Sequence, residues 1–302
     1  MTATDEKTQN RLNKQFFRSL LEESISELFA VIIGKGFEIV LNGKRIEAVA
    51  LTLLVSKKKG GIRPYVFKGI VKDVKVEVVV GFHRDPSKVG EADEDEKTAG
   101  VMRAGWSVIC NDRLVLYGNK DVETGWGTRG IPYFHPQYNS IAGVVTMQSD
   151  NPGELPLNTT KHGIDVSFGV YLKVLDYMSE GVKRFIAFTN RWKGRVAETA
   201  PEFVGTIEVA ASEVSGAIPE EDFIAINKSR LAEKSANAKE YMPDLPVPPR
   251  ENSARRICFS RPTEQVRAVA NALFADEEAK PGDVGAECFD RFFATIRPRG
   301  RR

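Results

Sequence analysis

Hydrophobic residues recur with helical spacing in two long stretches of the sequence. Between residues 11 and 33, apolar side chains follow one another at intervals of three to five residues, which places them on one face of a helix. Gly34 and Gly36 predict its end, because glycine adopts the left-handed backbone typical of a helix C-terminus. The same spacing predicts a second helix over 167–192, with this buried face: Val170, Val174, Tyr177, Met178, Val182, Phe185, Ile186 and Trp192.

Between these helices the pattern changes to the period of β-strands. Residues 37–49 flank the turn dipeptide Asn42-Gly43 and predict a hairpin packed on the end of the first helix. Valines at every second position from 74 to 80 predict a half-buried strand. Residues 105–118 predict another hairpin around Asn111-Asp112, and 141–148 a short strand.

Loops separate these elements. Residues 83–100 combine a proline with an acidic cluster, 119–140 are rich in aromatic residues, glycine and proline, and 149–165 are polar. Strands followed by a loop and a helix predict an α+β sandwich, a mixed sheet with helices on one face.

The composition becomes more polar after residue 195. We expect 196–250 to be a polar, Pro-rich linker region, since 243–250 holds four prolines in eight residues. In 251–302 we expect a small C-terminal α/β unit: a strand at 255–262, then a helix capped by Thr263, and a basic tail.

Charge and cysteine content limit the classes of protein and the cellular compartments to consider. Lys and Arg number 43 against 41 Asp and Glu, a net charge of +2 that does not favour a dedicated nucleic-acid binder. No apolar run approaches the about 18 residues that a membrane span needs. The three cysteines lie far apart without a CxxC motif, which is typical of a reducing setting, and we expect a cytoplasmic protein.

The sequence offers few candidate catalytic residues. The three histidines lie far from one another and from the cysteines, so no metal site is predicted. Cys110 stands in an apolar strand and is expected to be a buried small hydrophobe, and His135 is expected to be structural. The best candidate is the loop 155–165, where Lys161 offers a point charge suited to phosphate oxygens, and Thr159 and Thr160 offer hydroxyl donors. A solvated surface loop is the alternative for these residues.

An ordered set of motifs resembles one family. A Cys-Asn-Asp-Arg hairpin (110–113), Gly-Trp-Gly (125–127), Pro-Tyr-Phe-His (132–135) and Leu-Pro-Leu-Asn-Thr-Thr-Lys (155–161) occur in the order found in the transducer region of GHKL ATPases. This superfamily includes gyrase, heat-shock chaperones, histidine kinases and mismatch-repair ATPases. Residues 11–195 look most similar to bacterial chaperone-like or MORC-like ATP-binding proteins.

The resemblance implies a fold and a role. The family's transducer has a ribosomal-protein-S-five-like fold with a left-handed crossover, and it projects a lysine onto the γ-phosphate of ATP. Thr160-Lys161 matches the end of that motif, while Thr159 stands where glutamine is typical. By this resemblance Lys161 is the catalytic residue, and Asn158, Thr159, Thr160 and Lys161 contact ATP, which is bound with Mg²⁺.

The family's Bergerat nucleotide-binding domain is not recognisable in the sequence. Glu22 and Glu23 lack the associated asparagine, and Asp283–Glu287 matches the DxGxG motif only in part. We expect this domain on another chain or in an upstream segment. The predicted organisation is an N-terminal junction helix (1–36), a transducer domain (37–195), the linker region and the C-terminal unit.

Three functions remain open at this point. The first is a transducer subunit or fragment of an ATPase, with homodimer formation possible. The second is a degenerate, non-catalytic binding or assembly module that uses the aromatic loop 126–138 and the basic tail. The third is a nucleic-acid-binding accessory protein, which rests on basic residues at two places: Arg184, Arg191, Lys193 and Arg195, then Arg297, Arg299, Arg301 and Arg302.

Overall fold

The computed structural model of the chain forms two units, Met1–Pro248 and Pro249–Arg302, each with its own internal contacts. The structure describes these residues: 15–58, 60–88, 101–158, 163–226, 238–249 and 257–296.

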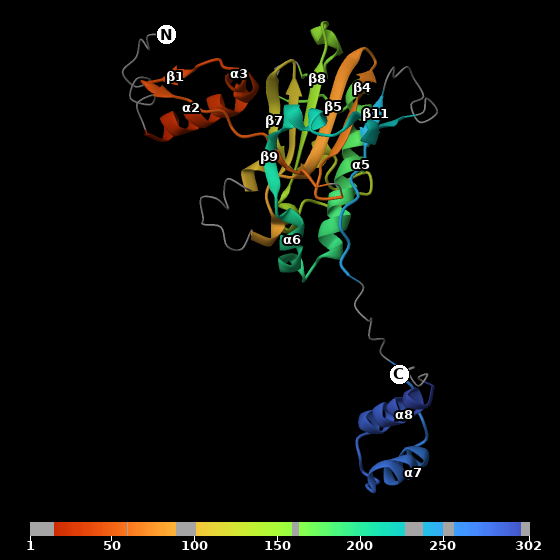
Figure 1. Cartoon of the computed structure of the whole chain (residues 1–302). Coiled ribbons are helices and arrows are strands. Elements are labelled where there is room, and N and C mark those ends of the chain that lie inside the picture. Colours follow the sequence, from red (N-terminus) through yellow and green to blue (C-terminus); the bar gives the residue numbers. More distant parts are fainter. Residues whose placement is uncertain are drawn as a thin grey trace. The chain divides into compact units, whose positions relative to one another are not determined.

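The first unit begins with a helical layer (Figure 1). Helix α2 (Gln15–Leu28) and the short α3 (Ala30–Gly34) confirm the predicted first helix over its described part, with a break at Phe29. The chain then turns at Gly36 with a φ of 98°. Strands β1 (Val40–Leu41) and β2 (Lys44–Arg45) form the predicted hairpin, and Lys44 lies 2.6 Å from Glu22 of α2.

A seven-stranded mixed sheet is the centre of this unit, in the order β10-β11-β4-β5-β8-β6-β7. Its strands are β4 (Tyr65–Val71), β5 (Val74–Phe82), β6 (Gly105–Cys110), β7 (Arg113–Asn119), β8 (Ile141–Gln148), β10 (Ile224–Ala225) and β11 (Lys239–Tyr241). Strands β6 and β8 run parallel, and the other neighbours run antiparallel. Because β6 lies between β7 and β8 in the sheet, the connection from β7 to β8 crosses β6. In a simple meander, consecutive strands would be neighbours.

The predicted hairpins and strands of the sheet are confirmed. Strands β6 and β7 pair around Asn111 and Asp112, whose φ angles of 43° and 64° are left-handed, as a tight turn of this type requires. Strand β8 has the predicted bounds.

Strand β5 is buried on both faces, so the prediction of a half-buried strand is wrong for its second half. Val74, Val76, Val78 and Val80 pack with α5 in the larger core, whereas Val79 packs in a second core on the other face. A ribbon of β3 (Thr52–Ser56) and β9 (Thr206–Ala210), the turn Ala211–Gly216 and Ala30 of α3 cover this second face. The α+β class is confirmed, but helical residues contribute to both faces.

Helix α5 (Gly169–Arg191) confirms the predicted second helix and packs on β4, β5 and β8 (Figure 1). Its predicted apolar stripe is buried throughout. Tyr177 stacks on Phe67 with ring centroids 3.6 Å apart. Gly181 allows the close approach of the helix to the sheet, because a Cβ there would lie 2.5 Å from the Tyr65 ring.

The prediction of a linker over 196–250 is wrong for most of its length. Strand β9 pairs with β3, α6 (Ala200–Phe203) brings Phe203 into the core, and β11 pairs with the edge of β4. Hydrogen bonds to distant strands stabilise these short polar segments, which have no periodicity of their own. Residues 243–249 have no helix or strand, as their prolines predict, and the carbonyl of Pro246 accepts a 3.2 Å hydrogen bond from Trp192 Nε1.

The second unit contains two helices, α7 (Thr263–Phe274) and α8 (Pro281–Ile296). The strand expected at 255–262 is not formed over 257–262, so an α/β unit is wrong for the described residues. Thr263 is the first helical residue rather than the cap; Pro262 occupies the N-cap position, and no side-chain hydrogen bond caps this helix. Among the described residues of both units, no helix is long and apolar enough to cross a membrane.

Candidate functional site

The structure describes the two ends of the predicted phosphate-contacting loop 155–165. We call these flanking residues, 155–158 and 163–165, the neck of the loop. Asn158 lies in the described part, while Thr159, Thr160 and Lys161 lie outside the described residues. Leu157 and Ile164 form an antiparallel bridge, and the Asn158 N–H donates a 3.1 Å hydrogen bond to the Gly163 carbonyl. The two ends of segment 159–162 are therefore held side by side.

The hydrophobic core anchors this neck. Leu155 and Ile164 are buried in the larger core together with Val170 of α5. Asp165 Oδ1 accepts hydrogen bonds of 3.0 and 2.6 Å from the backbone and hydroxyl of Ser167, which hold the pKa of Asp165 below its ordinary value. The turn from the neck into α5 is thus fixed by its own hydrogen bonds.

Two turns, one between β6 and β7 and one between β4 and β5, lie at the same end of the sheet. Asn111 exchanges side-chain hydrogen bonds of 2.8 and 3.0 Å with the backbone of Ser149, which follows β8. Lys72 lies beside the start of α5, where a Cβ at Gly169 would be 2.9 Å from its Nζ. Both turns join strands of the central sheet, and Lys72 lies beside Gly169, the residue with which α5 begins.

Loop 119–140, which includes the aromatic loop 126–138, contributes most of its aromatic side chains to the core. Trp126 packs edge-on against Phe134 and lies 5.7 Å from Tyr138, and both Trp126 and Tyr138 are buried. His135 Nδ1 accepts a 3.2 Å hydrogen bond from the Gln137 N–H, which confirms a structural role. A binding module that uses this loop would have Tyr133 as its exposed aromatic residue, since Tyr133 is 77% exposed.

The basic residues at the end of α5 have different surroundings. Arg195 pairs with Glu198 at 2.6 Å, and an Arg184 nitrogen lies 2.7 Å from the Met242 sulfur, while Arg191 and Lys193 are exposed. Arg184 and Arg191 line one pocket together with other basic and acidic side chains, namely Arg129, Lys183, Asp176, Glu180 and Asp244.

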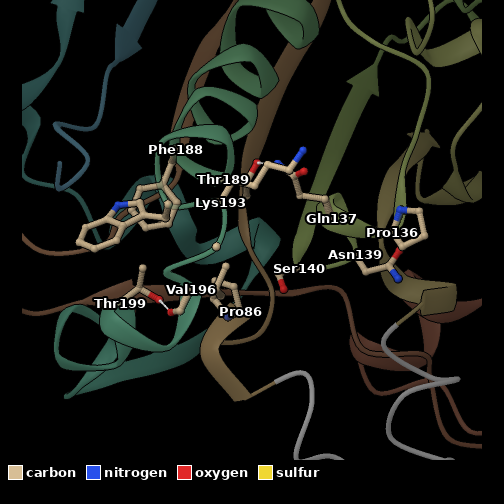
Figure 2. A pocket seen from close by; sticks show the side chains of 12 residues that line it. Pro86, Pro136, Gln137, Asn139, Ser140, Phe188, Thr189, Lys193, Val196 and Thr199 are labelled. Atoms are coloured by element: carbon tan, nitrogen blue, oxygen red, sulfur yellow. Dashed lines mark hydrogen bonds between the residues drawn. The ribbon is translucent and has the colours of Figure 1, made fainter. Parts of the chain in front are cut away.

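A cavity of about 200 Å³ opens at the C-terminal end of α5 (Figure 2). Three segments that are distant in the sequence form it: Pro86 in the loop after β5, the turn before β8, and the end of α5 with the turn after it. Its lining residues are Pro86, Pro136, Gln137, Asn139, Ser140, Phe188, Thr189, Trp192, Lys193, Gly194, Val196 and Thr199.

Several polar side chains of this cavity are hydrogen-bonded within the protein. Gln137 Nε2 donates to Asn190 Oδ1 at 2.8 Å, and Thr199 Oγ1 donates to the Val196 carbonyl at 2.7 Å. The Ser140 hydroxyl is different: the residue is 3% exposed and lines the cavity, yet its hydroxyl has no partner among the described residues.

His83 holds this wall of the cavity in place. Its backbone N–H donates to the Ser140 carbonyl at 3.0 Å, and its Nε2 lies 2.8 Å from the Asn139 carbonyl. A carbonyl can only accept, so Nε2 carries the proton and Nδ1 is an acceptor, without a partner among the described residues. Burial lowers the pKa of His83 to about 3, although the bond to Asn139 favours the charged form; Arg103, Arg84 and Lys120 lower it further.

Cys110 does not offer a reactive thiolate. Cys110 is buried as predicted, and burial raises the pKa of its thiol to about 12, so the thiolate is not accessible near neutral pH. Among the described residues, no group of three His, Cys, Asp or Glu side chains could hold a metal ion.

Sequence patterns did not indicate the cavity. Phe188 and Trp192 look like ordinary core residues of a helix, and Ser140 has no motif around it. Only the fold brings them together, so no local signal could have found the site.

Comparison with protein-family models gives no match, and comparison with curated protein sequences gives none either.

Proposed function

We propose that this chain is the transducer part of a GHKL-type ATPase, in which Lys161 contacts the γ-phosphate of ATP bound by a Bergerat-fold domain. That domain would be a separate chain or a segment upstream of residue 1. The chain would relay the nucleotide state to its partners.

The observation that carries this proposal is the neck of the loop. A lysine that reports a phosphate must be held by a rigid base, because an error of about 1 Å in position costs much of its effect. Leu155 and Ile164 are buried, the bridge Leu157–Ile164 closes the neck, and α5 begins directly after it. A solvated surface loop would not need such an anchor.

The role of Lys161 would be electrostatic. Phosphoryl transfer depends on positioning and on stabilising the charge that spreads over the γ-phosphate oxygens. An ammonium group supplies that charge, and the hydroxyls of Thr159 and Thr160 would add neutral hydrogen bonds. Movement of the neck would then be transmitted to α5 and to the core beneath it.

The mixed sheet and its covering helix are compatible with the ribosomal-protein-S-five-like fold of such transducers. Helix α5 covers one face, and the parallel pair β6–β8 interrupts an otherwise antiparallel sheet. This finer assignment is part of the proposal.

The N-terminal layer offers a surface for the nucleotide-binding domain. Helix α2, the turn after α3 and strand β1 leave several large apolar side chains more than one third exposed: Phe17, Leu20, Leu21, Phe37 and Val40. A neighbouring domain would bury this surface, as expected for a junction helix.

The test is ATP hydrolysis by the chain combined with its nucleotide-binding domain. We expect Lys161→Ala to reduce kcat about 100-fold, the usual effect of removing one charged group from a transition-state site. Lys161→Arg should retain part of the rate, because it keeps the charge.

Lys183→Ala is the matched control, since Lys183 is an exposed lysine on α5. It should hydrolyse ATP within twofold of the unchanged protein. A Lys161→Ala rate within twofold of the unchanged protein would refute the proposed role.

A further inference from the structure

The cavity at the end of α5 has the size of one aromatic ring. Its volume is about 200 Å³. An apolar cavity of about 150 Å³ accepts benzene, whereas pockets for cofactors and drug-sized ligands span roughly 300–1,000 Å³. A single ring with one small substituent therefore fits, and a nucleotide does not.

The walls of the cavity favour a flat apolar group. Pro86, Pro136 and Val196 contribute aliphatic surface, and Phe188 and Trp192 contribute aromatic rings (Figure 2 labels all but Trp192). The Trp192 Nε1 donates to the Pro246 carbonyl, so the indole has no donor left for a ligand. Rings packed in this way prefer edge-to-face or offset contacts with another ring.

One wall also presents a hydrogen-bonding group that the protein leaves unused. Ser140 is 3% exposed, and its hydroxyl has no partner in the described part of the chain. Inside this mostly apolar cavity, a ligand that supplies a partner for the Ser140 hydroxyl gains affinity and specificity.

The cavity is also preformed. His83 holds the Asn139 and Ser140 backbone with two hydrogen bonds of 2.8 and 3.0 Å. Gln137 bonds across to Thr189 and Asn190 of α5. Little reorganisation is therefore needed when a ring enters, which lowers the cost of binding.

We propose that this cavity binds a phenol ring, with the phenolic hydroxyl bonded to Ser140. A phenol both donates and accepts a hydrogen bond, as does the serine hydroxyl. The ring is either a free small molecule or the side chain of a tyrosine in a protein partner. The proposal does not depend on the ATPase function.

The test compares 4-fluorophenol with fluorobenzene, two probes that differ by the hydroxyl group, in ¹⁹F NMR titrations of the full chain. We expect 4-fluorophenol to bind about five- to tenfold more tightly, the effect of one satisfied hydrogen bond. Ser140→Ala should remove this preference and leave the fluorobenzene affinity within twofold. Ser212→Ala, at an exposed serine outside the cavity, is the matched control and should change neither.

Filling the cavity gives an independent readout. Val196→Phe should abolish binding of both probes without loss of the thermal unfolding transition; if it does not fold, Val196→Met replaces it. N-acetyltyrosinamide distinguishes the sources: binding as tight as that of 4-fluorophenol indicates a tyrosine side chain, and binding of the phenol alone indicates a free molecule. Equal affinities of the two probes, an unchanged preference in Ser140→Ala, or no binding of either probe would overturn the proposal.

Discussion

Acidification should destabilise the first unit through one buried side chain, His83. The residue is 2% exposed, and burial lowers its pKa from 6.5 to about 3. The unfolded chain therefore binds a proton more tightly than the folded chain between these two values. The contribution of neutral His83 is fully present above pH 6.5 and is lost progressively as the pH falls toward 3.

The size of the effect follows from the two pKa values. Between pH 7 and pH 5 the unfolded histidine becomes mostly protonated, while the folded one stays neutral. The free energy of unfolding should fall by about 2 kcal/mol over this interval, at 1.36 kcal/mol per pH unit once the unfolded group is protonated.

Urea unfolding at pH 7 and pH 5 measures this loss. The three tryptophans, Trp106, Trp126 and Trp192, are buried in the first unit and report its unfolding by fluorescence. His83→Gln keeps an N–H donor for the Asn139 carbonyl but does not titrate, so it should lose about 2 kcal/mol less than the unchanged protein over the interval. His135→Gln, at an exposed histidine, should behave like the unchanged protein.

The comparison between variants removes the contribution of the carboxylates, which titrate in all of them. An equal loss in His83→Gln and in the unchanged protein would refute the reasoning.

Two further substitutions test the packing of the first unit by urea unfolding. Phe82→Ala should cost about 3–5 kcal/mol, because Phe82 is fully buried and contacts the rings of Phe185, Phe188 and Phe203 edge-on; a cost below about 1 kcal/mol would contradict this core. Gly143→Ala should cost about 1–3 kcal/mol, because its Cβ would overlap the buried Trp106 ring, whereas Gly216→Ala, with open space around it, should stay within about 0.5 kcal/mol. Equal effects of the two glycine substitutions would argue against the close contact of β8 with Trp106.

Elements with strong local signals could be predicted from the sequence. Strand β8 and helix α5 combine clear periodicity with flanking loops, and the Asn111-Asp112 turn has residues that tolerate a left-handed backbone. Strand β11 could not be predicted, because its three residues form a strand only by pairing with the edge of β4. The burial of Val79 depends on the ribbon β3–β9, which also comes from a distant part of the chain.

The two candidate sites, loop 155–165 and the cavity at the end of α5, also differ in how far the sequence predicts them. Loop 155–165 is recognisable because its residues are contiguous, whereas the cavity joins Pro86, Ser140 and Trp192 across more than 100 residues of sequence. A site of this second kind follows from topology alone.

The central proposal, that Lys161 meets the γ-phosphate, is tested most directly by photoaffinity labelling. An ATP analogue with a photoreactive group on its γ-phosphate would be irradiated with the chain and its nucleotide-binding domain, and labelled peptides would be identified by mass spectrometry. We predict ATP-competable labelling of the segment between Asn158 and Gly163. Labelling confined to other segments, with none in this one, would contradict the proposal.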